Sequence, residues 1–106
     1  MVNIAIIGGG DRGSVLMEIL HKRDDLSILG ICDIDSESPG MELARKMGIP
    51  AYERLEDVLK NPKLDLVIET TGKTSVREQV QDIKLDHAFL IGVKSPFYIK
   101  YVKPGE

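Results

Sequence analysis

The sequence has a single cysteine, no long apolar run and no excess of basic residues, and each of these shortages excludes a class of protein. Cys32 has no second cysteine to pair with, so neither an internal disulfide nor a zinc cluster is expected. No apolar segment approaches the roughly 20 residues that cross a bilayer, and the first residues lack the basic start of a secretory signal. A cytoplasmic protein without a membrane partner is therefore expected.

Charge and the absence of familiar catalytic patterns exclude further classes. The chain carries 14 Lys and Arg against 17 Asp and Glu, a net charge of −3 without a basic cluster, which argues against a nucleic-acid partner. It contains no Ser-His-Asp set, no Walker sequence and no metal-ligand spacing, so no metal site is expected. With 106 residues, 42% of them hydrophobic, residues 1–106 are expected to form one domain, with no room for a substrate domain.

The most informative pattern that is present lies in residues 1–35. An apolar run over Val2–Ile7 leads into Gly8-Gly9-Gly10-Asp11-Arg12-Gly13, a helical stretch follows, and a second apolar run ends at Asp33. A strand, a G-x-G-x-x-G turn, a helix and a second strand closed by an acid about 20 residues later form the dinucleotide-binding fingerprint. Gly8 permits the tight turn, Gly10 lets a pyrophosphate approach the backbone, and Gly13 lets the helix pack on the sheet. The N–H groups and the dipole at the start of the helix favour the phosphate charge.

The acid that closes the second strand predicts the choice of cofactor. Asp33, followed by Ile34, is placed to accept hydrogen bonds from a ribose, and its alternative role is to cap the turn after the strand. Asp35 adds a second negative charge and no arginine lies near, so the 2′-phosphate of NADP would be repelled. NAD is therefore predicted over NADP. For Arg12 the alternatives are a phosphate contact, pairing with Asp11, or solvation.

Strand and helix patterns alternate along the rest of the chain. Helices are expected over residues 14–22, from Pro39 or Gly40 to Met47, over Leu55–Leu59 and over 75–83, and strands over Val2–Ile7, 27–32, 49–52, 64–68 and 88–91. In the first helix Val15, Leu16, Ile19 and Leu20 share one apolar face. This alternation predicts an α/β fold, a three-layer Rossmann-type parallel sheet with strand order 3-2-1-4-5 and helices on both faces. Residues 93–106 have no clear pattern.

These motifs resemble the N-terminal nucleotide-binding domain of the Gfo/Idh/MocA-type oxidoreductases and, more loosely, those of homoserine dehydrogenase and dihydrodipicolinate reductase. Besides the first strand and glycine turn, the matching stretches are Ile31-Cys32-Asp33-Ile34-Asp35, Ala44-Arg45-Lys46-Met47-Gly48-Ile49-Pro50 and Leu64-Asp65-Leu66-Val67-Ile68-Glu69-Thr70-Thr71-Gly72. The resemblance implies NAD(P) binding, with the glycines around the pyrophosphate, Asp33 at the adenosine ribose and the loop from Thr70 to Gly72 near the nicotinamide half. The expected cofactor-binding residues are Gly8, Gly9, Gly10, Asp11, Arg12, Gly13, Asp33, Ile34, Thr70, Thr71 and Gly72.

The sequence departs from the family pattern after the fifth expected strand. Those enzymes usually carry a Glu-Lys-Pro motif there, and its lysine serves catalysis, whereas this chain has Gly92-Val93-Lys94-Ser95-Pro96. Lys94 is therefore the catalytic candidate, with a solvated lysine as the alternative. The first hypothesis is an NAD(H)-binding domain of an oxidoreductase that is inactive alone. The alternatives are an NAD(H)-sensing regulatory module and a domain for another adenosine-containing ligand such as coenzyme A. The expected partners are the dinucleotide and either a second copy or a missing C-terminal domain.

Overall fold

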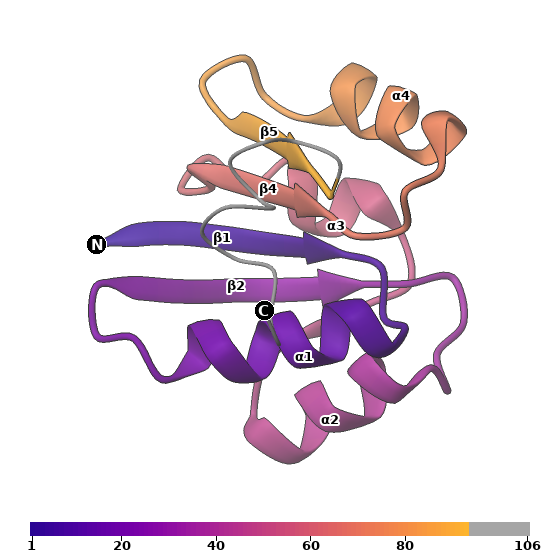
Figure 1. Ribbon diagram of the computed structural model, residues 1–106. Coiled ribbons are helices and arrows are strands. Elements are labelled where there is room, and N and C mark those ends of the chain that lie inside the picture. Colours follow the sequence, from indigo (N-terminus) through magenta and orange to yellow (C-terminus); the bar gives the residue numbers. More distant parts are fainter. Residues whose placement is uncertain (94–106) are drawn as a thin grey trace.

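The structure, a computed structural model, describes residues 1–93, in which strands and helices alternate (Figure 1). In chain order the elements are β1 (Val2–Ile7), α1 (Asp11–His21), β2 (Leu26–Cys32), α2 (Pro39–Met47), β3 (Ala51–Tyr52), α3 (Leu55–Leu59), β4 (Leu66–Glu69), α4 (Thr74–Ile83) and β5 (Phe89–Gly92). Among these residues, no helix combines the length and the apolar character that a membrane span requires.

The strands form one parallel sheet in the order β3-β2-β1-β4-β5. In Figure 1 the arrowheads of β1, β2, β4 and β5 point toward the same edge of this sheet. The chain runs outward from β1 to β3 and then returns past β1 to β4, so the loops after β1 and β4 leave from neighbouring strands. Sheets of this kind bind ligands at that reversal of strand order. The predicted fold class and strand order are confirmed.

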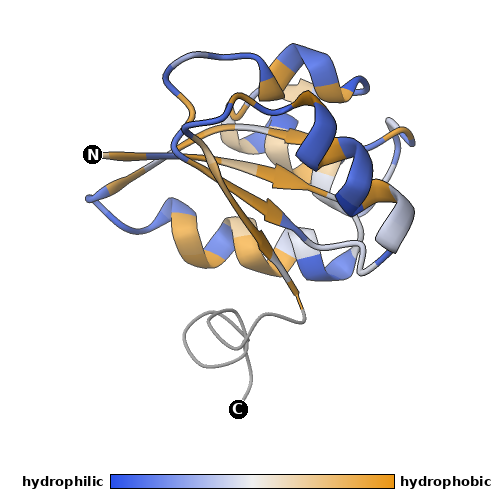
Figure 2. Ribbon diagram, turned by 90° about the horizontal axis from the view of Figure 1, so that it is seen from above, coloured by the Kyte–Doolittle hydropathy of each residue, from blue (hydrophilic) through white to orange (hydrophobic). Residues whose placement is uncertain are grey.

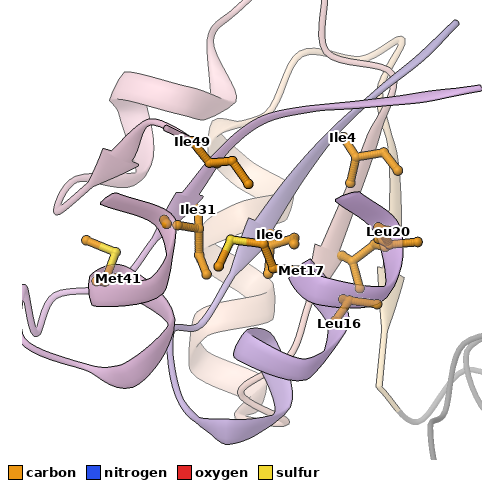
Figure 3. Close-up of a cluster of buried hydrophobic side chains, with 10 residues drawn as sticks. Ile4, Ile6, Leu16, Met17, Leu20, Ile31, Met41 and Ile49 are labelled. Carbon is orange, nitrogen blue, oxygen red and sulfur yellow. The ribbon is translucent and has the colours of Figure 1, made fainter. Parts of the chain in front are cut away.

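Both faces of the sheet are covered by helices, as the alternation of side chains along β1 requires. Ile4 and Ile6 pack in one cluster with side chains of α1 and α2 (Figure 3). Ala5 and Ile7 point to the opposite face and pack with side chains of α3 and α4. Figure 2 accordingly shows strands that are mostly hydrophobic between helices that carry both hydrophobic and hydrophilic residues. The three layers thus follow from apolar residues on both faces of the central strand.

The first helix differs from its prediction in both its start and its buried face. It begins at Asp11 instead of residue 14, because Gly10 is extended and serves as the N-cap. Its buried residues are Gly13, Leu16, Met17 and Leu20, whereas Val15 and Ile19 are 38% and 40% exposed. The close packing of Gly13 on the first strand's turn fixes the helix rotation, and positions three, four and seven residues later then face the sheet.

The other boundaries shift by a few residues at most. The helix predicted to end at Met47 is confirmed and begins at Pro39, and Gly48 ends it in the left-handed conformation with φ 74°. Pro50 is excluded from the third strand, which shortens to Ala51–Tyr52 at the sheet edge. The last two strands begin later than expected, at Leu66 and Phe89. Residues 94–106, including the candidate Lys94, lie outside the described residues.

Candidate functional site

The glycines of the turn after β1 each meet a different steric requirement. Gly8 has φ +109°, a conformation that side chains disfavour, and its N–H donates to Cys32 O at 2.8 Å. A Cβ placed on Gly13 would lie 1.9 Å from Gly8 O, so only glycine allows α1 to approach the turn this closely. A Cβ on Gly10 would have no atom within 4 Å, and Gly10 itself is exposed. The backbone is therefore bare at the N-terminus of α1, where an anion is favoured.

Asp33 is held by backbone donors on both of its carboxylate oxygens. Gly9 N–H donates to Oδ2 at 2.6 Å, and Asp35 N–H donates to Oδ1 at 2.9 Å. The first bond ties the acid to the glycine turn, and the second is the turn-capping bond that the sequence left as an alternative. A carboxylate oxygen has two lone-pair directions, so each oxygen keeps capacity for a ribose hydroxyl. The two roles predicted for Asp33 are compatible.

The segment that joins β2 to the first turn of α2 also binds Gly9, the residue whose N–H donates to Asp33. Gly40 N–H donates to Gly9 O at 2.6 Å, so both polar groups of Gly9 are bound to the β2–α2 segment. Ser38 Oγ is buried against Gly9 and has no hydrogen-bond partner among residues 1–93. A Cβ on Gly9 would come within 2.3 Å of this hydroxyl oxygen. Gly9 therefore belongs to the site through packing rather than through an open approach to a ligand.

The loop after β4 is bonded to the glycine turn. Thr70 Oγ1 donates to Ile7 O at 2.9 Å and lies 3.2 Å from Gly8 O, and the Thr70 side chain is buried. Arg12 Nη1 donates to Thr70 O at 3.1 Å. No ion pair between Arg12 and Asp11 occurs among the described residues. The guanidinium therefore bridges α1 and the β4 loop, a role that was not among its predicted ones.

Glu69 is a buried carboxylate that the sequence argument did not single out. It is the last residue of β4 and is 2% exposed. Its Oε1 accepts the N–H of Thr71 at 2.7 Å, the N–H of Gly72 at 3.1 Å and the Thr71 hydroxyl. Gly72 adopts φ +71° to make this turn. The sequence signal for Glu69 was a charged residue at the end of an apolar strand. A carboxylate buried there requires several hydrogen-bond donors, which the loop after the strand can supply.

Two cavities meet at the carboxyl edge of the sheet. The larger, of about 450 Å³, is lined by Gly8, Gly10, Asp11, Arg12, Gly13, Asp33, Thr70, Thr71 and Lys73. The smaller, of about 180 Å³, is lined in part by Cys32, Asp33, Ile34, Val76 and Gln79. All but Gly9 and Gly72 of the expected cofactor-binding residues thus line one of these two cavities, and Asp33 lines both. Lys73, Val76 and Gln79 also line these cavities and were not predicted from the sequence.

The ionisable groups around the cavities give no sign of a metal site or a reactive thiol. Residues 1–93 contain no group of three or more His, Cys, Asp or Glu side chains that could hold a metal ion. Burial, together with the carboxylates of Asp33, Asp57 and Glu56, raises the pKa of the Cys32 thiol to about 12. Because the thiolate is the nucleophile and the metal ligand, this thiol is far less reactive at neutral pH than an ordinary cysteine.

Comparison with known proteins identifies the family. The family model described as "oxidoreductase family, NAD-binding Rossmann fold", that of Gfo/Idh/MocA, matches residues 2–85. The chain belongs to the Gfo/Idh/MocA family. This Gfo/Idh/MocA domain is an NAD(P)-binding domain, and the resemblance seen in the glycine turn and Asp33 is confirmed.

The relatives of this Gfo/Idh/MocA domain are longer proteins. An acetaldehyde dehydrogenase of Thermomicrobium roseum is 35% identical over 79 residues, or 72% of this chain and 26% of that protein. A solved NAD-binding protein from Listeria innocua has a TM-score of 0.68 and 26% identity, covering 86% of this chain and 26% of that one. Homoserine dehydrogenase of S. aureus has a TM-score of 0.70 at 19% identity, with 87% of this chain and 25% of that one covered, and it supports the fold alone. The chain spans only about a quarter of each of these proteins.

Proposed function

We propose that this domain binds NAD(H), in preference to NADP(H), along the cleft between the glycine turn and Asp33. The observation that carries the preference is the fixed carboxylate of Asp33 at the junction of both cavities. Two hydroxyls of an adenosine ribose can donate to its two oxygens. The 2′-phosphate of NADP would instead meet the negative charges of Asp33 and the neighbouring Asp35.

The residues present fit a dinucleotide. The open backbone at Gly10 admits a pyrophosphate to the N–H groups at the start of α1, and the helix dipole favours its charge. The smaller cavity, with Ile34 and Val76 beside Asp33, has the apolar wall that suits an adenine ring. A bound nicotinamide cofactor supplies hydride transfer. This chain binds and orients it, and a substrate-binding region from elsewhere would complete an oxidoreductase.

Calorimetric titration of the chain with NAD, NADH, NADP and coenzyme A tests the proposal. We expect NAD to bind at least about tenfold more tightly than NADP, because one charge-assisted hydrogen bond contributes about 1.5–3 kcal/mol. Gly10→Val should abolish binding and leave the fold intact, since its side chain would enter open space. Equal affinities for NAD and NADP would refute the preference, and wild-type affinity in folded Gly10→Val would refute the site.

Asp33→Asn separates ribose recognition from loop order. Asparagine retains the size of the side chain but only one acceptor oxygen, so the Gly9 and Asp35 amides compete for it and affinity for every nucleotide should fall somewhat. The ratio of the NAD and NADP dissociation constants cancels that shared loss. We expect this ratio to move toward unity, because the variant lacks the charge that repels the 2′-phosphate. An unchanged ratio would show that Asp33 acts on the loop alone.

A further inference from the structure

Lys73 lies where the cavities of the carboxyl edge meet. It is the residue before α4 and serves as its N-cap. It lines the 450 Å³ cavity, the 180 Å³ cavity, and a third, smaller hollow at the carboxyl ends of β4 and β5 that Glu69 and Arg77 also line. The cleft lined by the N-terminus of α1 is therefore also lined by a lysine that comes from the loop after β4.

The backbone beneath this lysine is firmly held. Lys73 N–H donates to Thr71 Oγ1 at 3.1 Å, and the Thr71 N–H and hydroxyl both donate to the buried Glu69. Gly72 N–H donates to the same carboxylate oxygen at 3.1 Å. The buried Glu69 carboxylate thus holds Thr71 and Gly72 directly, and Thr71 in turn holds the N–H of Lys73. The Lys73 backbone is fixed, and the long side chain beyond it can adjust to a ligand.

The charges of the cleft leave Lys73 available for an anion. The cleft is lined by the acids Asp11 and Asp33 and by the cations Arg12 and Lys73. Arg12 is engaged with the carbonyl of Thr70. Lys73 forms no ion pair within residues 1–93, where the two observed pairs are Arg23–Asp25 and Arg54–Glu56. The Lys73 ammonium is exposed, its backbone is held by hydrogen bonds, and the open N-terminus of α1 lines the same cleft. Such an ammonium can donate a charge-assisted hydrogen bond to a phosphate oxygen.

We propose that the ammonium group of Lys73 binds the pyrophosphate of the dinucleotide, from the side of the cleft opposite the glycine turn. The inference rests on the proposed NAD(H) site. It assigns the glycine turn and α1 to one side of the pyrophosphate, through backbone N–H groups, and Lys73 to the other, through its ammonium group. Glu69 then acts as a positioning residue, because it holds the loop that carries the lysine.

Titration of Lys73→Met against adenosine, ADP-ribose, NAD and NADP tests this assignment. Methionine keeps the apolar stem of the lysine and removes its charge. We expect about tenfold weaker binding of ADP-ribose and NAD, the loss of one charge-assisted hydrogen bond at an exposed site, with adenosine unaffected. The affinity of the variant for NAD should also depend less on salt than that of the parent, because one screened charge is gone. Lys73→Arg should recover most of the affinity.

Lys46→Met is the matched control, since Lys46 is exposed in the last turn of α2 and lines none of the three cavities. It should bind all four ligands as the parent does. Equal NAD affinity in Lys73→Met and the parent would overturn the assignment. So would an equal loss for adenosine, or a loss confined to NADP, which would assign the lysine to the adenosine pocket or to a 2′-phosphate. Failure of the parent to bind NAD would instead refute the proposed function itself.

Discussion

Substituting Gly13 by alanine is a sharp test of how closely α1 packs on the glycine turn. A Cβ at this position would lie 1.9 Å from Gly8 O and 3.3 Å from Thr70 Oγ1. The carbonyl oxygen would have to retreat by about 1.1 Å to reach 3.0 Å, a separation below which real Cβ atoms essentially never lie. Gly8 O also lies 3.2 Å from Thr70 Oγ1, so that retreat would disturb the bond between the two loops.

The energetic cost follows from two opposing effects. Overpacking that moves backbone costs about 1–3 kcal/mol or more, and alanine returns up to about 1 kcal/mol through its higher helix propensity. We expect a net destabilisation of about 2 kcal/mol, which lowers Tm by roughly 8–16 °C in a domain of this size.

Gly10→Ala is the control three residues away. Nothing lies within 4 Å of its Cβ, so the variant should stay within about 0.5 kcal/mol of the parent, a weaker N-cap being offset by lower entropy of the unfolded chain. Thermal unfolding followed by circular dichroism measures both variants. A Gly13→Ala domain as stable as Gly10→Ala would refute the packing argument.

Two further predictions concern the buried groups Glu69 and Cys32. Glu69→Gln should lower the free energy of unfolding by no more than about 1 kcal/mol, because an amide oxygen can accept the hydrogen bonds that Oε1 accepts. Glu69→Ala should lower it by about 2–3 kcal/mol, because those donors are left unpaired. Urea unfolding measures both variants, and equal losses would mean that the charge itself matters. Cys32, whose pKa is about 12, should resist iodoacetamide at pH 8 while the domain is folded, and alkylation faster than unfolding would contradict this. Because the unfolded thiol has a pKa near 9.0, the folded state keeps a proton that the unfolded state loses, so this group should lower stability as the pH rises from 9 toward 12.

The sequence predicted the features that depend on local pattern. The apolar runs around Val2–Ile7 and Leu26–Cys32, the glycine turn between them and the left-handed Gly48 are determined by residues close in the chain, and the structure has them. The rotation of α1 was wrong because Val15 and Met17 are both apolar, and only the contact of Gly13 with the turn decides which is buried. Tertiary contacts overrode the pattern there.

In the loop after β4, Thr70, Thr71 and Gly72 were predicted only through the family resemblance, and the contacts of this loop could not be predicted from local pattern. Arg12 reaches Thr70 across 58 residues of sequence, and Lys73 approaches the glycine turn only because β4 pairs with β1. The role of Glu69 depends on three hydrogen-bond donors that cannot be inferred from the presence of a glutamate in the sequence. Parallel sheets bring loops together that are distant in the chain, so the contacts between those loops cannot be predicted from local motifs.

The distance along the chain between the glycines and the acid has a physical origin in the pairing of β1 with β2. The register pairs Ile7 with Cys32, and Gly8 N–H donates to Cys32 O, so the next residues of the two strands, Gly8 and Asp33, leave the sheet side by side. Asp33 then meets the N–H of Gly9 at 2.6 Å. The intervening residues need only form the helix and turn of one crossover. An acid at this place therefore holds the glycine turn through its own hydrogen bond, and under the proposed function its carboxylate is already oriented for a ribose. If the ribose binds there as proposed, its recognition and the order of the glycine turn are coupled through one side chain.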